Sequence, residues 1–182
     1  MHALVVYESM FGNTRAIAEA IAKGMSTRAK VRVTDVVDAP AEVPPEVDVL
    51  VVGGPTHAFS MSREATRQDA ARRGGAHTDV PAGIREWLRE LPDGDHPQTF
   101  VAFDTRVDLP LVPGAAARSA SRQARKRGFT VADPESFLVE GYEGPLADGE
   151  LDRATAWGRR LGEQLEQDLR TKAAFRAAGD AR

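Results

Sequence analysis

The chain opens with a strand that passes directly into an amphipathic helix, and this strand–helix unit repeats along the sequence. Residues 3–7 (ALVVY) form a short apolar, β-branched run, which is typical of a strand covered on both faces. Ile17, Ile21 and Met25 then recur every four residues, which predicts a helix with one apolar face. A strand of this kind followed by a helix indicates the interior of a parallel sheet.

The same alternation continues to the C-terminus. Apolar runs predict four more strands, at residues 30–37, 47–52, 99–103 and 129–139, the last interrupted by Asp133-Pro134. Periodic segments predict further helices at residues 81–91 and 113–127 and from Glu150 onward, with a short one at 63–73. Because most connections are too long for hairpins, we expect an α/β fold with helices on both faces of a parallel sheet.

Composition excludes several classes of protein. The 182 residues suit one domain, and 24 basic against 27 acidic residues leave a net charge of −3, too balanced to indicate nucleic-acid binding. Cysteine is absent, which excludes disulfides and thiolate metal sites and fits a cytoplasmic location. The four histidines lack the spacing of metal ligands, so we expect no metal, and no apolar run is long enough for a membrane span.

Residues 9–14 (SMFGNT) join the first strand to its helix and form a candidate anion site. Backbone amides at a helix N-terminus point outward and carry partial positive charge, and Gly12 allows close approach of an anion. Asn13 or Thr14 is expected to cap the helix. The segment matches neither the P-loop nor the dinucleotide pattern. On these grounds alone, a phosphate site and an ordinary capped turn both stay open.

Two segments carry a specific resemblance. Residues 5–22 (VVYESMFGNTRAIAEAIA) and 47–62 (VDVLVVGGPTHAFSMS) resemble the phosphate loop and the ring-lining turn of the flavodoxin-like superfamily. The resemblance implies a three-layer sandwich with a five-stranded parallel sheet of order 2-1-3-4-5. It also implies FMN as cofactor, with a redox partner protein or a flavin reductase as partner. The domain would span residues 1–170, and 171–182 would form a frayed tail.

The resemblance also implies site residues. Those expected to hold the FMN phosphate are Ser9, Met10, Phe11, Gly12, Asn13 and Thr14. Those expected at the flavin ring are Pro55, Thr56, His57 and Ala58, with Phe59 as an alternative aromatic contact, and Asp104, Thr105 and Arg106 from the third loop. This third loop (residues 104–110) lacks the aromatic that the family usually places over the second face of the ring. No catalytic acid or base is expected.

Two arginine-rich segments admit more than one interpretation. Four arginines, at 63, 67, 72 and 73, lie in a long polar stretch at 56–80 with Glu64, Asp69, His77 and Asp79. They form either a solvated mixed-charge segment or a surface for an acidic partner or a nicotinamide phosphate. The stretch itself is too long for an ordinary connection and suits a lid, a binding loop or a flexible region. The basic run at 118–127 is interpreted as the solvent-facing side of a helix.

Three functions follow from the resemblance. The first is an FMN-dependent carrier of electrons between proteins, in which the flavin performs the chemistry. The second is an oxidoreductase acting on a quinone, protoporphyrinogen or similar substrate, which the near-neutral charge favours. The third is a module of the same fold that has lost tight FMN binding, which the missing aromatic and Ala58 favour.

Overall fold

The structure is a computed structural model that describes residues 1–57, 59–73, 82–108 and 115–179. Its strands are β1 (His2–Tyr7), β2 (Lys30–Asp35), β3 (Val49–His57), β4 (Ser60–Met61), β5 (His96–Val107), β6 (Phe129–Val131) and β7 (Glu135–Val139). Its helices are α1 (Asn13–Met25), the 3-10 helix η1 (Val36–Asp38), α2 (Glu64–Arg72), α3 (Ile84–Glu90), α4 (Ala116–Lys126) and α5 (Glu150–Gly179). The predicted alternation of strands and helices is confirmed.

The sheet is parallel and runs in the order β2-β1-β3-β5-β6, with β7 also pairing parallel with β5. β6 pairs with the first part of β5 and β7 with its second part, so together they fill the fifth position of the sheet. This is the last strand predicted at 129–139 with its break at Asp133-Pro134. The expected fold class and strand order are therefore confirmed, and β4 adds a short antiparallel pairing to β3.

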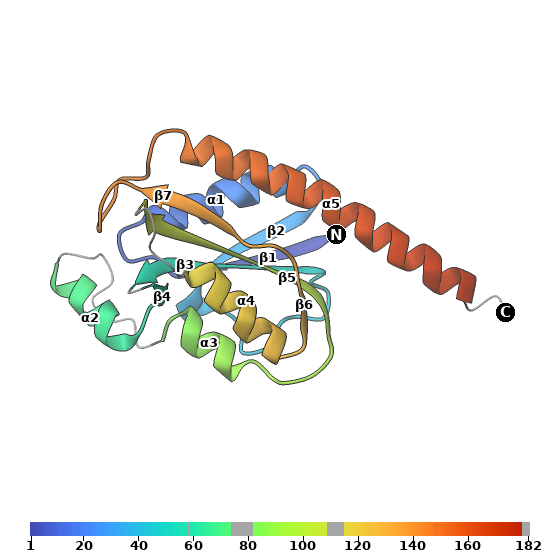
Figure 1. Ribbon diagram of the computed structural model, residues 1–182. Helices are drawn as coiled ribbons and strands as arrows, with labels where there is room; N and C mark the ends of the chain where they lie inside the picture. The colour runs from blue at the N-terminus through green and yellow to red at the C-terminus, as the bar shows by residue number, and fades with distance from the viewer. Residues whose placement is uncertain (58, 74–81, 109–114, 180–182) are drawn as a thin grey trace.

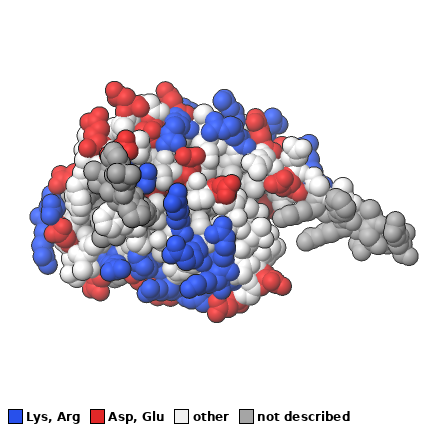
Figure 2. Space-filling view, in the orientation of Figure 1, with Lys and Arg blue, Asp and Glu red and all other residues white. Residues whose placement is uncertain are grey.

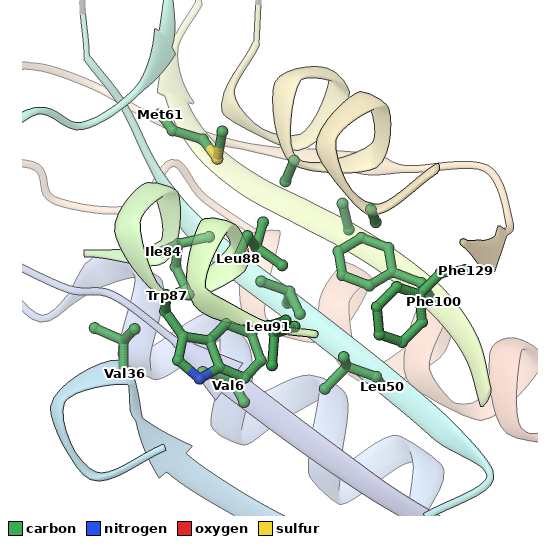
Figure 3. Close-up of a cluster of buried hydrophobic side chains, with 14 of the residues drawn as sticks. Val6, Val36, Leu50, Met61, Ile84, Trp87, Leu88, Leu91, Phe100 and Phe129 are labelled. Carbon is green, nitrogen blue, oxygen red and sulfur yellow. The ribbon is translucent and has the colours of Figure 1, made fainter. Parts of the chain in front are cut away.

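Helices cover the sheet on both faces (Figure 1). Because side chains alternate along a strand, Leu4 and Val6 of β1 face α3 and α4, whereas Val5 faces α1 and α5. On the first face, Trp87 and Leu88 of α3 pack over the sheet (Figure 3). Both cores consist of fully buried apolar side chains, and this burial holds the three layers together.

On the second face, α1 and α5 cross at very short distance. A Cβ added at Gly158 would lie 2.2 Å from the carbonyl oxygen of Ile21, and one at Gly24 would lie 2.1 Å from that of Thr155. Glycine at both positions allows the two backbones to touch. The crossing fixes α5 across the sheet, and Figure 1 shows the helix continuing beyond the sheet edge.

Two strands extend further than predicted. β3 continues through Gly53-Gly54-Pro55 to His57, and β5 continues past Phe103 to Val107. The reason is mutual pairing, since Gly54 lies opposite Asp104 and Pro55 opposite Thr105 in the ladder. The space beside Gly53 is filled by the Phe103 ring. Residues 104–106, predicted in a loop, therefore lie on β5.

Other predicted bounds shift by a few residues. The strand expected to reach Val37 ends at Asp35, whose carboxylate accepts from the amide of Val37 and starts η1. The short helix expected at 63–73 is present as α2. α5 runs to Gly179, past the point where we predict fraying, and the domain boundary at 170 stays a prediction. In the described part of the chain, no helix is long and apolar enough to cross a bilayer.

Candidate functional site

The carboxyl ends of four strands meet at one edge of the sheet and enclose a small pocket of about 50 Å³. Its lining comes from the loop after β1, the ends of β3 and β5, and the end of β7 with the loop that follows. The lining residues are Ser9, Met10, Phe11, Asn13, Thr14, Pro55, Thr56, His57, Thr105, Arg106, Val107, Val139 and Tyr142. Most of the predicted site residues therefore lie together.

The first turn of α1 leaves its backbone donors free. Gly12 is the N-cap, with φ of 87°, and no side chain caps the helix, so the predicted capping by Asn13 or Thr14 is wrong. Among the described residues, nothing accepts a hydrogen bond from the amides of residues 10–14. A Cβ added at Gly12 would meet nothing within 4 Å, so the left-handed conformation of this residue is what calls for glycine.

Asn13 and Thr14 instead tie the loop to its neighbours. The Thr14 and Thr105 hydroxyls share a buried hydrogen bond of 2.7 Å. The Asn13 side-chain amide donates to the carbonyl oxygen of Glu143 at 2.8 Å. These two bonds attach the helix start to β5 and to the loop after β7, respectively, and so shape the pocket wall.

Two polar atoms beside this loop lack partners. The Ser9 hydroxyl and the Nε of Arg106 are both buried, and neither has a hydrogen-bond partner in the described structure. Both residues line the pocket. Because a buried polar group without a partner is costly, two of them at one pocket indicate a place where a ligand completes the hydrogen bonding.

Three aromatic rings of the pocket lining contact one another. Tyr142 makes edge contacts with His57, at 5.7 Å between centroids, and with Phe11, at 5.8 Å. An aromatic ring thus reaches the pocket from the loop after β7, although the third loop lacks one. The sequence contains one signal for Tyr142, because this residue follows the last predicted strand. The carboxyl ends of all parallel strands lie at the same sheet edge, so a residue just after that strand is expected near the pocket.

Burial sets the charge of His57. The ring is only 9 % exposed, and burial, aided by the positive charge of Arg67, lowers its pKa below the usual value. His57 is therefore neutral at neutral pH, so each of its ring nitrogens is either a donor or an acceptor.

Two residues predicted at the ring do not line the pocket. Asp104 is fully buried, and its carboxylate accepts from the amide of Ala117 and from the Thr56 hydroxyl, which places it at the start of α4. Burial raises its pKa. Phe59 is 56 % exposed with φ of 66° and lines no part of the pocket. Ala58 lies outside the described residues.

The arginines at 63–73 have separate roles. Arg67 is buried and donates to the Ser62 hydroxyl at 2.9 Å and to Glu86 at 3.0 Å, so it cannot receive a partner. Arg73 pairs with Asp69 and lies 5.0 Å from the centre of the Tyr142 ring. Helix α2 thereby reaches the pocket mouth through this cation–π contact. His77 and Asp79, also predicted in this cluster, lie outside the described residues.

Comparisons with known proteins agree with this geometry. The family model described as Flavodoxin matches residues 5–74, which include the first two pocket segments. Among solved structures, a flavodoxin from the domain Archaea is 24 % identical, with a TM-score of 0.62 over 91 % of this chain and 99 % of its own. The Streptococcus pneumoniae TIGR4 flavodoxin is 13 % identical, with a TM-score of 0.62 over 90 % and 99 %.

A third structure, a flavone reductase, is 14 % identical with a TM-score of 0.57, over 91 % of this chain and 63 % of its own. No curated protein matches the chain by sequence. The chain is a protein of flavodoxin-like fold, as its sequence predicts.

Proposed function

We propose that the protein binds FMN in the pocket at the C-terminal sheet edge and carries electrons between protein partners. The observation that carries this proposal is the set of unpaired donors around residues 9–14. Free amides of the first turn of α1, the Ser9 hydroxyl and Arg106 Nε have no acceptor within the described structure. A phosphate monoester supplies the acceptors and the negative charge that this set requires.

The residues present fit the cofactor at both ends. The phosphate would accept from the amides of residues 10–14 and from Ser9, and the bond between the Thr14 and Thr105 hydroxyls ties the start of α1 to β5 beside it. His57 and Tyr142 would border the flavin ring, since flat aromatic groups bind well against one another. When bound, FMN supplies the redox chemistry, and the chain's residues orient it and exclude water.

Entry of the ring requires movement of Tyr142. The cavity of about 50 Å³ is far below the roughly 300 Å³ of the smallest ordinary ligand pockets. Tyr142 is 46 % exposed and is held by edge contacts, by Arg73 and by the Asn13–Glu143 bond of its own loop. These are individually weak contacts, so the loop at 140–145 is the element we expect to open.

An oxidoreductase is the second candidate, and one observation favours it. Helix α2 belongs to the long segment after β3, and Arg73 at its end covers Tyr142 at the pocket mouth. Such a cover suits an enzyme that encloses a small substrate against the flavin. A cytoplasmic location remains part of the proposal for both functions.

Stopped-flow reduction of the FMN-loaded protein separates the two functions. For a carrier, we expect slow reduction by NAD(P)H alone and fast reduction when a separate flavin reductase is added. Fast reduction by NAD(P)H alone would favour the enzyme. A colourless purified protein that fails to quench FMN fluorescence on titration would instead indicate a module without flavin.

Replacement of His57 is expected to change how the flavin potential depends on pH. Below the lowered pKa of His57, a protonated ring beside the flavin would favour added negative charge and raise the potential. His57→Ala should remove this rise, by about 40 mV at acidic pH, and leave the potential at pH 8 nearly unchanged. Potentiometric titration between pH 5 and 8 measures both values, and identical curves would remove His57 from the site.

A further inference from the structure

A second concave site lies between α3, α4 and β4. This groove has a volume of about 440 Å³ and shares no lining residue with the candidate flavin pocket. Its lining is dominated by cations, namely Arg85, Arg89, Arg122, Lys126 and Arg127, with Asp93 as the acidic member. In Figure 2, Lys and Arg side chains gather on the face formed by α3 and α4.

Two of the five cations are already committed to the fold. Arg85 donates to the Ser60 hydroxyl and to the carbonyl oxygens of Met61 and Ser62, and so fixes β4. Arg127 binds the Asp93 carboxylate at 2.7 Å, which also neutralises the acidic member of the lining. These contacts build rigid walls on two sides of the groove.

The other three cations have no partner in the described part of the chain. Arg89, Arg122 and Lys126 are exposed, and no ion pair or side-chain hydrogen bond engages them. Arg85 and Arg89 are four residues apart on α3, as are Arg122 and Lys126 on α4, so each helix turns a pair of like charges toward the groove. Like charges at this spacing destabilise a helix.

This concentration of charge is notable because the whole chain carries a net charge of −3. Repulsion among the four cations that have no acidic partner in the described structure disfavours the bare groove, and an anion that enters it removes the repulsion and gains several charge-assisted hydrogen bonds. The predicted interpretation of residues 118–127 as a plain solvated helix face accounts for Arg118 and Arg125, which lie outside the groove, but leaves Arg122 and Lys126 without a role.

We propose that the groove binds a small molecule bearing two or more phosphate groups. Its volume lies in the range of ordinary small-molecule sites, and its concave shape brings cations from two helices around one ligand. The Ser60 and Ser119 hydroxyls and Gln123 add neutral hydrogen-bonding groups, and Met61 is the apolar contribution to the described lining. Several phosphates, rather than one, match the number of free cations.

Calorimetric titration with tripolyphosphate tests the site directly. Separate titrations with ADP and ATP test whether a nucleotide binds. The test variant is Arg122→Gln with Lys126→Gln, and the control is Arg118→Gln with Arg125→Gln, which removes the same charge from exposed positions of the same helix that do not line the groove. Each lost charge-assisted contact weakens binding about tenfold or more. We therefore expect a loss of about 100-fold in the test variant and less than about threefold in the control.

Several results would overturn the proposal. Absence of tripolyphosphate binding at about 0.1 M salt would do so, because exposed charges alone are screened there. Equal weakening in the two variants would show a diffuse charge effect. Binding of polyglutamate without binding of tripolyphosphate would assign the face to an acidic protein instead.

Tighter binding of ATP than of tripolyphosphate would support the site and add a nucleoside contact. All four cations changed are exposed, so the variants should fold.

Discussion

Replacing Ser9 with Ala is expected to weaken FMN binding about tenfold or more and to leave riboflavin binding unchanged. The Ser9 hydroxyl is buried at the pocket without a partner, and a hydrogen bond to a charged phosphate is worth about 1.5–3 kcal/mol. Riboflavin lacks the phosphate and so loses nothing. Quenching of flavin fluorescence during titration gives both dissociation constants. Adding Thr14→Ala should enlarge the difference between the two ligands.

The same substitution should not destabilise the protein without ligand. Removing a buried hydroxyl that has no partner is neutral or stabilising, by up to about 1 kcal/mol. Ser121→Ala is a matched control, because the Ser121 hydroxyl of α4 is also buried without a partner and lies away from the pocket. It should leave FMN binding intact. If Ser9→Ala weakened both flavins equally, the phosphate would not lie at this loop.

The second large effect is expected at Arg67, which joins the long segment after β3 to the core. Arg67 binds Ser62 and Glu86, and its guanidinium approaches the buried Glu8. A Cβ added at Gly83 would lie 2.5 Å from Glu8 Oε2 and 2.7 Å from Arg67 Nη1. Removal of one partner from a buried ionic cluster typically destabilises by about 3–5 kcal/mol, and we expect this loss for Arg67→Leu in urea unfolding.

The pH dependence of this loss tests its cause. Burial raises the pKa of Glu8, and the charge of Arg67 opposes that rise. Without Arg67, ionised Glu8 is more costly, so the loss should be largest near pH 8 and should shrink as Glu8 takes up a proton at lower pH.

Two further variants act as controls for Arg67→Leu. Glu8→Gln in the Arg67→Leu background should recover part of the lost stability at pH 8. Arg72→Leu, at an exposed position of the same helix, should change stability by less than about 0.5 kcal/mol. Equal losses for Arg67→Leu and Arg72→Leu would show that Arg67 has no special role in stability.

The turn at residues 9–14 and the start of α1 could be predicted because their signals are contiguous in sequence. Residues 9–14 contain the turn, the glycine with positive φ and the helix start in one segment, so local pattern and local geometry coincide. The alternation of strands and helices predicted a parallel sheet covered on both faces, whereas the strand order was implied by the resemblance to the flavodoxin-like superfamily.

Other parts of the site depend on contacts between residues that are far apart in the sequence. Tyr142 meets Phe11 and His57 only because β7 ends at the same sheet edge as β1 and β3. Asp104 was expected at the ring, but ladder pairing extends β5 through it and aims its carboxylate at α4. Likewise, Arg67 resembles the other arginines of its segment in sequence, and only its tertiary contacts, such as those with Ser62 and Glu86, distinguish it as buried. Such contacts are set by tertiary packing, which a local pattern does not contain.

The central claim is that the free amides at the start of α1 hold the phosphate of FMN. An amide nitrogen–proton NMR spectrum recorded during titration tests this claim most directly. We expect the amide signals of Phe11, Gly12, Asn13 and Thr14 to shift with FMN and, more weakly, with inorganic phosphate, and to stay in place with riboflavin. Signals from these residues that do not move with FMN, or that move equally with riboflavin, would contradict the claim.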